Sequence, residues 1–307
     1  MRKYVFGPIL SRRLGVSLGI DLVPAKTCPL DCIYCEARAT TLLTDKRMEY
    51  VPIDEVISEL DETLKNDPMP DYITFSGAGE PTLNSGIGKV IKFVKTNYPH
   101  CKLCLLTNGL LLGDPVLCKD LLALDLVIPS LDASSEREYQ EINRPVKSST
   151  LEKLVKDIAG FSEIYSGRLV VEIFVVPGIN DSPESIERFK KLIEKISPDA
   201  VQLNSLDRPG VVPDLKTADP ETLQRFADVL SQVVEVEIIN PIPANSKKNI
   251  SSELEGELLN IIRHRSQDLQ GLSAVTGIPL DELETKLRHL ADKKLIFCDD
   301  GKYFPAD

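Results

Sequence analysis

The chain has 307 residues, of which 42% are hydrophobic, so it is long enough for one large domain and one small one and is not disordered as a whole. Its net charge of −11 argues against a broad nucleic-acid-binding surface. No apolar run approaches the roughly 18 residues that a membrane span needs, and residues 1–8 lack the pattern of a signal peptide. We therefore expect a cytoplasmic protein without a membrane anchor.

Short apolar runs alternate with amphipathic stretches between residues 15 and 240. Six strands are predicted, over 15–22, 72–75, 102–107, 126–128, 169–176 and 200–203. Helical spacing occurs between them, over 52–65, 87–97 and 183–196. This alternation predicts an α/β fold built from parallel βαβ units, either a partial barrel or a doubly wound sheet. In both architectures the chemistry gathers at the carboxyl ends of the strands.

The pattern changes near Pro241 and Pro243, where a linker is predicted. Three helices and a hairpin are predicted beyond it, over 253–263, 269–276, 280–293 and 295–304. This order resembles a winged-helix module, a small α+β domain. We expect a catalytic domain over 1–243 and the winged-helix-like domain over 244–307.

The predicted winged-helix-like domain carries nine basic and eleven acidic residues after residue 245. Phosphate neutralisation dominates nucleic-acid affinity, so this balance is poor for a stand-alone DNA-binding domain. Protein docking or peptide handling is the alternative role.

Three of the seven cysteines lie close together, with the spacing C-x3-C-x2-C, at Cys28, Cys32 and Cys35. Three thiolates in so short a loop can ligate three irons of a cubane [4Fe–4S] cluster and leave the fourth iron open to a substrate or cofactor. A structural zinc site needs a fourth soft ligand close by, and the nearest histidine and further cysteine are His100 and Cys101. Buried thiols without a metal are the remaining alternative.

Cys101 and Cys104 flank a predicted strand, three positions apart. Residues at this spacing point to opposite faces of a sheet. We therefore expect core thiols at these positions and no second cluster.

The cysteine spacing, with the aromatic Tyr34 just before the third cysteine, resembles that of the radical S-adenosylmethionine (SAM) superfamily. Further segments similar to those of the family follow in the same order: Ser76-Gly77-Ala78-Gly79-Glu80-Pro81-Thr82, Thr107-Asn108-Gly109, Ser130-Leu131-Asp132 and Asn143-Arg144-Pro145. The resemblance covers about residues 1–240. Residues 7–21 further resemble a subgroup of Fe–S oxidoreductases that is placed near the wybutosine-synthesis enzymes, which modify tRNA.

This resemblance implies a partial (β/α)6 barrel that binds a [4Fe–4S] cluster through Cys28, Cys32 and Cys35. It also implies that S-adenosylmethionine is bound by residues at the strand ends: Tyr34, Gly77, Gly79, Glu80, Pro81, Asn108, Ser130 and Asp132. Each of these segments on its own is equally typical of a turn. Ala78 interrupts the family's paired glycines, so the local backbone is expected to differ there.

The resemblance further implies that SAM is cleaved reductively to a 5′-deoxyadenosyl radical, which takes a hydrogen atom from the substrate. The electron has to arrive at low potential, so a ferredoxin or flavodoxin is the expected partner. The sequence assigns no residue that quenches the product radical.

Five basic residues are candidates for holding a phosphate or carboxylate of the substrate: Arg12, Arg13, Lys26, Arg144 and Arg208. A solvated, salt-bridged surface is the alternative for them. Because residues 1–26 carry a local charge of +4 and resemble RNA-modifying enzymes, an RNA nucleoside is the favoured substrate. A peptide or small metabolite is the second hypothesis. A redox-sensing, DNA-binding regulator with an Fe–S cluster is a third, of another class.

Overall fold

The computed structural model describes most of the chain. The described residues are 2–11, 13–67, 69–206, 210–239, 258–259, 261–262, 267–276, 278, 280–299 and 301–306. Arg12, Arg208, the predicted linker and the predicted boundary between residues 243 and 244 lie outside them, as does most of the predicted helix over 253–263. Among the described residues, no helix combines the length and the apolar character that crossing a membrane requires.

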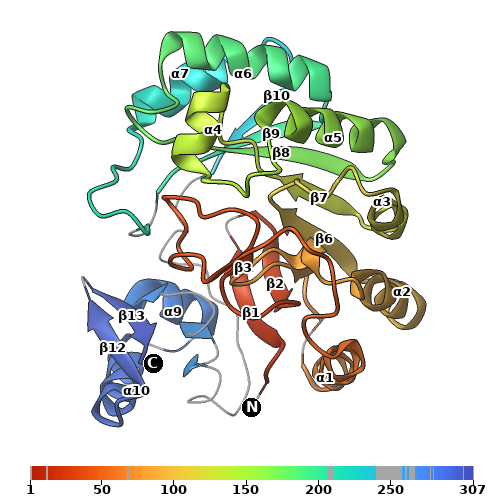
Figure 1. The fold of residues 1–307 in the computed structure, drawn as a ribbon. Helices are drawn as coiled ribbons and strands as arrows, with labels where there is room; N and C mark the ends of the chain where they lie inside the picture. The colour runs from red at the N-terminus through yellow and green to blue at the C-terminus, as the bar shows by residue number, and fades with distance from the viewer. Residues whose placement is uncertain are drawn as a thin grey trace.

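An eight-stranded sheet forms the body of the protein, in the order β1-β2-β5-β6-β7-β8-β9-β10 (Figure 1). The strands are β1 (Val5–Ser11), β2 (Gly15–Ile20), β5 (Tyr72–Phe75), β6 (Lys102–Thr107), β7 (Leu126–Pro129), β8 (Arg168–Phe174), β9 (Ala200–Asn204) and β10 (Glu235–Ile238). Strand β1 is antiparallel to β2, and the later neighbours pair in parallel. Because the strand order follows the chain order, the sheet has no topological switch point. It is a partial barrel and not a doubly wound sheet.

Helices connect the parallel strands and cover the outer face of the sheet (Figure 1). They are α1 (Ile53–Asn66), the 3-10 helix η1 (Pro81–Leu83), α2 (Ile87–Asn97), α3 (Pro115–Leu121), α4 (Glu136–Ile142), α5 (Leu151–Ile164), α6 (Pro183–Ile196) and α7 (Pro220–Leu230). Local sequence explains where several begin. Asp114, Ser182 and Asp219 accept backbone N–H bonds from the first turns of α3, α6 and α7, and each is followed by a proline at the first helical position.

The two faces of the sheet belong to different hydrophobic clusters. The outer face packs against the helices in the main core, which includes Ile73, Leu105, Val127, Val171 and Val201. The inner face forms a smaller cluster that includes Leu126, Ile128, Val170 and Ala200. Cys101 lies in the main core and Cys104 in the inner cluster, which confirms that these two thiols are buried on opposite faces.

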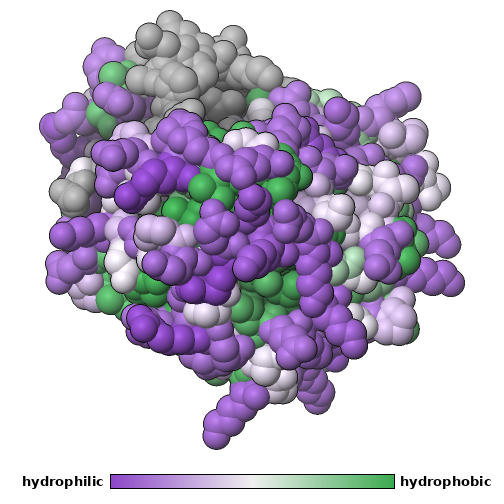
Figure 2. Space-filling view, turned by 90° about the horizontal axis from the view of Figure 1, so that it is seen from above, coloured by the Kyte–Doolittle hydropathy of each residue, from purple (hydrophilic) through white to green (hydrophobic). Residues whose placement is uncertain are grey.

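The surface shows the complementary pattern. On the face of the molecule that Figure 2 shows, hydrophilic side chains predominate and hydrophobic ones form small islands between them. This distribution is expected of a chain that carries 27% charged residues and has its apolar side chains in the core.

A second, smaller unit follows the barrel in the chain. It contains β11 (Gln267–Asp268), α9 (Leu269–Thr276), α10 (Leu280–Asp292), β12 (Ile296–Asp299) and β13 (Lys302–Pro305). The three strands form a sheet in the order β11-β13-β12, and the unit has a hydrophobic cluster of its own. Helix α9 lies beside β1 of the barrel (Figure 1). The bounds of α9 and the pairing of β12 with β13 confirm the predicted helix over 269–276 and the predicted terminal hairpin.

Candidate iron–sulfur site

The three clustered cysteines lie on the loop that follows β2, at the carboxyl ends of the strands. Cys28 belongs to the two-residue strand β3 (Thr27–Cys28), which pairs with β4 (Leu42–Leu43). The backbone N–H groups of Asp31 and Ile33 donate to the carbonyl oxygens of Asn143 and Ile142 at 3.0 and 2.9 Å. The cysteine loop is thus fastened to the end of α4, which comes more than 100 residues later in the chain.

All three thiols are free and half-buried. Burial, followed by the negative charge of Glu80, raises the pKa of Cys28 to about 12. Burial, followed by Asp132, raises the pKa of Cys32 well above its ordinary value. The neighbouring thiols contribute to both shifts, so the three sulfurs lie within electrostatic reach of one another.

The chemistry of the three donors suits an iron–sulfur cluster, because free thiols supply soft thiolate ligands. A cubane cluster takes each thiolate on a different iron. Three soft thiols on one loop therefore fit an iron–sulfur cluster, whose binding would displace the thiol protons that burial favours.

Each sulfur has a nitrogen donor from a different part of the chain. Lys26 Nζ lies 3.1 Å from Cys35 Sγ. The side-chain amides of Asn108 and Asn143 approach the other two sulfurs, with Asn108 Nδ2 at 3.6 Å from Cys28 and Asn143 Nδ2 at 3.4 Å from Cys32. The sequence predicted Asn108 and Lys26 for the site but gave Asn143 no role, because only the folded chain brings it beside Cys32.

Glu80, in the segment that follows β5, is buried. Its carboxylate accepts hydrogen bonds from Thr82 N (3.1 Å), Thr82 Oγ1 (2.6 Å), Thr107 Oγ1 (2.8 Å) and Asn108 N (2.8 Å). These contacts join the segment after β5 to the end of β6. The structure thus shows Glu80 as a connection between two strand ends, and its predicted contact with SAM stays a prediction.

The glycines of the same segment allow a close approach of the backbone. A Cβ on Gly79 would lie 2.5 Å from the carbonyl oxygen of Thr27, and one on Gly77 would lie 2.4 Å from Cγ of Asp21. Gly77 also has a φ of +131°. Pro81, the next predicted residue, begins η1 and is buried. This segment therefore packs directly against the start of the cysteine loop.

Asp132 connects the cysteine loop to β8. Its Oδ2 accepts from Tyr34 Oη (2.5 Å) and Asn143 Nδ2 (2.8 Å), and its Oδ1 accepts from the backbone N–H of Phe174 (3.1 Å). The Tyr34 ring stacks on the Phe174 ring, with centroids 3.9 Å apart. Burial is the main cause that raises the pKa of Asp132 to about 6. One face of the Tyr34 ring is thus covered by Phe174, and the Asp132 carboxylate already accepts three hydrogen bonds from protein groups.

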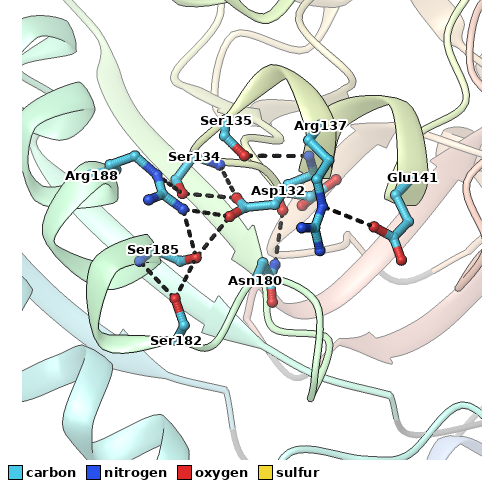
Figure 3. Close-up of polar contacts among 10 residues, drawn as sticks. Asp132, Ser134, Ser135, Arg137, Glu141, Asn180, Ser182, Ser185 and Arg188 are labelled. Carbon is cyan, nitrogen blue, oxygen red and sulfur yellow. Dashed lines mark hydrogen bonds and ion pairs between the residues drawn. The ribbon is translucent and has the colours of Figure 1, made fainter.

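A polar network behind Asp132 holds this part of the site (Figure 3). Asn180 Nδ2 donates to the Asp132 and Phe174 carbonyl oxygens, both at 2.8 Å. Farther out, buried Glu138 accepts from Ser134 and Ser185 and pairs with Arg188 at 2.8 Å. Helices α4 and α6 are joined by these contacts. Sequence reasoning missed them; the cap pattern at Ser135 and Glu138 was the available signal.

The remaining predicted residues are not all in one place. Arg13 forms an ion pair with Glu172 of β8. Arg144 is exposed, with a φ of +44°, directly after Asn143. Ser130 is half-buried and forms a β-bridge with Glu172. Of the basic candidates in the described part of the chain, Lys26 contacts Cys35, Arg144 directly follows Asn143, and Arg13 is paired with Glu172.

The fold is therefore a partial βα-barrel, and its three-cysteine loop at the carboxyl ends of the parallel strands is of a kind that binds metal. The family model of the Radical SAM superfamily matches residues 22–193. The chain belongs to this superfamily. Its members use a [4Fe–4S] cluster and SAM, which are the cofactors of this chain.

Several curated proteins resemble this chain. A Helicobacter pylori protein named UPF0026 protein is 32% identical over 93% of this chain and 92% of its own length. A Brachyspira hyodysenteriae protein named GTPase Obg is 35% identical over 96% of this chain, which spans only 42% of that relative. A probable dual-specificity RNA methyltransferase RlmN from Aquifex aeolicus is 26% identical over 54% of this chain and 49% of its own length.

The solved structures support the fold. A radical SAM methyltransferase from Sphaerobacter thermophilus matches with a TM-score of 0.58 and 15% identity, over 72% of this chain and 65% of that one. Streptococcus suis SuiB bound to SAM matches with a TM-score of 0.55 and 14% identity, over 77% of this chain and 54% of SuiB.

Proposed function

We propose that this chain cleaves SAM reductively at a [4Fe–4S] cluster held by Cys28, Cys32 and Cys35, and that its substrate is a nucleoside in RNA. The observation that carries the proposal is the three-thiol loop fastened across the carboxyl ends of a parallel barrel. When bound, the cluster supplies the electron that splits SAM into methionine and a 5′-deoxyadenosyl radical, which takes a hydrogen atom from the substrate.

The residues around the loop are proposed to bind and orient SAM. Gly77 and Gly79 lie against the start of the cysteine loop, and Asn108, directly after β6, approaches Cys28. Ser130 lies at the neighbouring strand end. The buried Oδ1 of Asn143 has no hydrogen-bond partner within the described residues. A buried acceptor that has no protein donor can accept a hydrogen bond from a bound molecule instead. The unpaired Oδ1 of Asn143 therefore supports the proposal that a ligand binds beside Cys32.

An RNA substrate is supported by three observations. The relative from Aquifex aeolicus is named an RNA methyltransferase. Residues 1–26 carry a local charge of +4. Arg144 is exposed and directly follows Asn143, whose side chain approaches Cys32. A peptide or small metabolite is the alternative, favoured by the net charge of −11. The electron is proposed to come from a ferredoxin or flavodoxin.

The small unit after the barrel is proposed to be a winged-helix-like domain, with the domain boundary near residue 243. Its helices α9 and α10, followed by the β12–β13 hairpin, support this proposal. Its near-neutral charge favours docking of a protein or of the substrate over independent DNA binding. A regulator that reads DNA would not need the strand-end segments of the barrel.

The substrate can be tested by stimulation of turnover. The protein is loaded with cluster anaerobically, reduced with dithionite and given SAM, together with either total bacterial RNA or the peptide and metabolite fraction of the same cells. We expect RNA to stimulate 5′-deoxyadenosine formation, nuclease treatment to abolish the stimulation, and added salt to weaken it steeply. Stimulation by the other fraction alone would show that the RNA assignment is wrong.

A further inference from the structure

Lys26 has an unusual position for a lysine. Its exposed fraction is 8%, and its φ of +62° places it in the left-handed region, which is unfavourable for a residue with a Cβ. The backbone is held there, because Lys26 N donates to the Ala78 carbonyl oxygen at 2.7 Å and its own carbonyl accepts from Leu42 N at 3.1 Å. A glycine would suit this conformation better, so the side chain itself calls for an explanation.

The side chain of Lys26 faces sulfur and not a carboxylate. Its ammonium lies 3.1 Å from Cys35 Sγ, and among the described residues no Asp or Glu forms an ion pair with it. A buried cation is costly unless an anion or several acceptors accompany it. At this site, the negative charge that could accompany the Lys26 ammonium is that of the three thiolates that would bind a cluster.

Lys26 also differs from the other two donors. Asn108 and Asn143 approach the remaining sulfurs at 3.6 and 3.4 Å, which gives each cysteine one side-chain N–H donor. These amides are neutral, so Lys26 alone of the three donors brings a positive charge. Hydrogen bonds to the sulfurs and nearby charge are the means by which a protein sets the reduction potential of an Fe–S cluster.

We propose that Lys26 is a positioning residue of the cysteine site: its ammonium donates to Cys35 and offsets the negative charge of the thiolates and of the electron that reduction adds. This inference rests on the proposed cluster, but on no particular substrate. Because the ammonium favours the more negative, reduced state, it raises the reduction potential. Lys26 is thereby assigned to the cofactor and not to the substrate.

The test is a potentiometric titration that measures the reduction potential of the cluster in the absence of SAM and substrate. The signal of the reduced cluster is monitored by electron paramagnetic resonance. The variants are Lys26→Met, Lys26→Gly, which also relieves the left-handed backbone, and Lys26→Arg, which keeps the charge. The matched control is Lys46→Met, because Lys46 is exposed in the segment that follows β4. Iron and sulfide content and thermal unfolding are measured for each.

We expect Lys26→Met and Lys26→Gly to lower the equilibrium constant for reduction by about tenfold, which is 59 mV for one electron. Lys26→Arg and Lys46→Met should stay near the wild type. An unchanged potential in loaded Lys26→Met or Lys26→Gly would overturn the proposal.

Loss of the cluster is also informative. If Lys26→Met folds but no longer holds the cluster, retention in Lys26→Arg supports the role of the charge, and loss in Lys26→Arg overturns it. A wild-type protein that takes up no cluster would instead refute the proposed function.

Discussion

Buried carboxylates at the strand ends explain how the site is built at the scale of single residues. Glu80 accepts four hydrogen bonds and Asp132 accepts three, all from protein groups. Each joins the segment after one strand to a neighbouring element. Hydrogen bonds to charged groups are the stronger ones, so these two side chains fix the loops that surround the cysteines.

A third buried carboxylate, Asp21, predicts how stability depends on pH. Burial raises its pKa from 3.8 to about 6, against the opposing hydrogen bonds from Ala78 N and Val23 N. The folded state therefore binds the proton more tightly than the unfolded state. The contribution of Asp21 to stability is complete below about pH 4 and is lost as the pH rises through about 6.

We expect Asp21→Asn to raise the free energy of unfolding at pH 7.5 by about 1–3 kcal/mol, the upper figure being the full shift at 1.36 kcal/mol per pKa unit. The amide oxygen can still accept from Ala78 N. Urea unfolding of the cluster-free protein at pH 7.5 and pH 4.5 measures the gain, which should shrink at the lower pH. An equal gain at both values would contradict the account of Asp21.

The sequence could predict candidate residues whose chemistry is distinctive, but not residues that reach the site only through the packing of distant segments. The three cysteines could be predicted because their spacing is local. The role of Asn143 could not, because a contact between positions 32 and 143 exists only after α4 has packed against the cysteine loop. Glu80 was predicted to bind SAM; the structure shows it buried and hydrogen-bonded to the end of β6, and the contact with SAM stays a prediction.

At the scale of elements, the network between α4 and α6 carries one prediction. Arg188 contacts the buried Glu138 as well as Ser134 and Ser185. Arg137 pairs with Glu141 at 3.7 Å on an exposed helix face (Figure 3). We expect Arg188→Ala to lower the free energy of unfolding by about 1–2 kcal/mol, a figure reduced because the Arg188 side chain is 42% exposed.

Urea unfolding at pH 7 measures this loss, and Arg137→Ala is the control, with an expected loss below about 0.5 kcal/mol. The difference in the free energy of unfolding between Arg188→Ala and the wild type should become smaller at acidic pH. The contacts lower the pKa of Glu138 against the effect of burial, so their contribution is lost as the pH falls and Glu138 is protonated. Equal losses in the two variants would contradict the account of this network.

The packing of the segment that follows β5 against the cysteine loop carries another prediction. In Gly79→Ala the new Cβ would lie 2.5 Å from a backbone oxygen, so the two segments have to move apart. We expect a loss of about 1–3 kcal/mol in stability, together with reduced iron content after cluster loading.

Gly160→Ala, on the exposed face of α5 with nothing within 4 Å of the new Cβ, is the control for Gly79→Ala. It should stabilise the protein by up to about 1 kcal/mol, because alanine favours the helix. Normal cluster loading and stability in Gly79→Ala would show that the close approach is not needed.

Elements with strong local signals were predicted with their bounds. The strands over 72–75 and 102–107 and the helices over 87–97 and 183–196 agree with the structure. The edge strands β1 and β10 were missed. Gly7 and Pro8 interrupt the pattern of β1, whereas β10 alternates charged and apolar residues and did carry a strand signal. Helices α3, α4, α5 and α7 were also missed, although α7, for example, begins with the helix start signal of Asp219 and Pro220.

At the scale of the whole molecule, the strand order decides where function can lie. Sequential parallel pairing brings the ends of β2, β5, β6 and β7 to one edge, and the cysteine loop comes directly after β2. Segments that lie far apart in the sequence, such as Cys32 and Asn143 with a separation of 111 residues, therefore surround one site. The second unit has its own core and lies beside β1, so it adds a surface without entering the barrel sheet.

The central claim is that the three-thiol site cleaves SAM reductively, and the most direct measurement is 5′-deoxyadenosine formation without substrate. The protein is loaded with cluster anaerobically, reduced with dithionite and incubated with SAM, and the product is quantified by mass spectrometry. Cys32→Ala is compared with Cys118→Ala, whose thiol is buried in the main core away from the loop. We predict product from the wild type and from Cys118→Ala, and none from Cys32→Ala. A wild-type protein with a loaded, reducible cluster that forms no 5′-deoxyadenosine would contradict the claim.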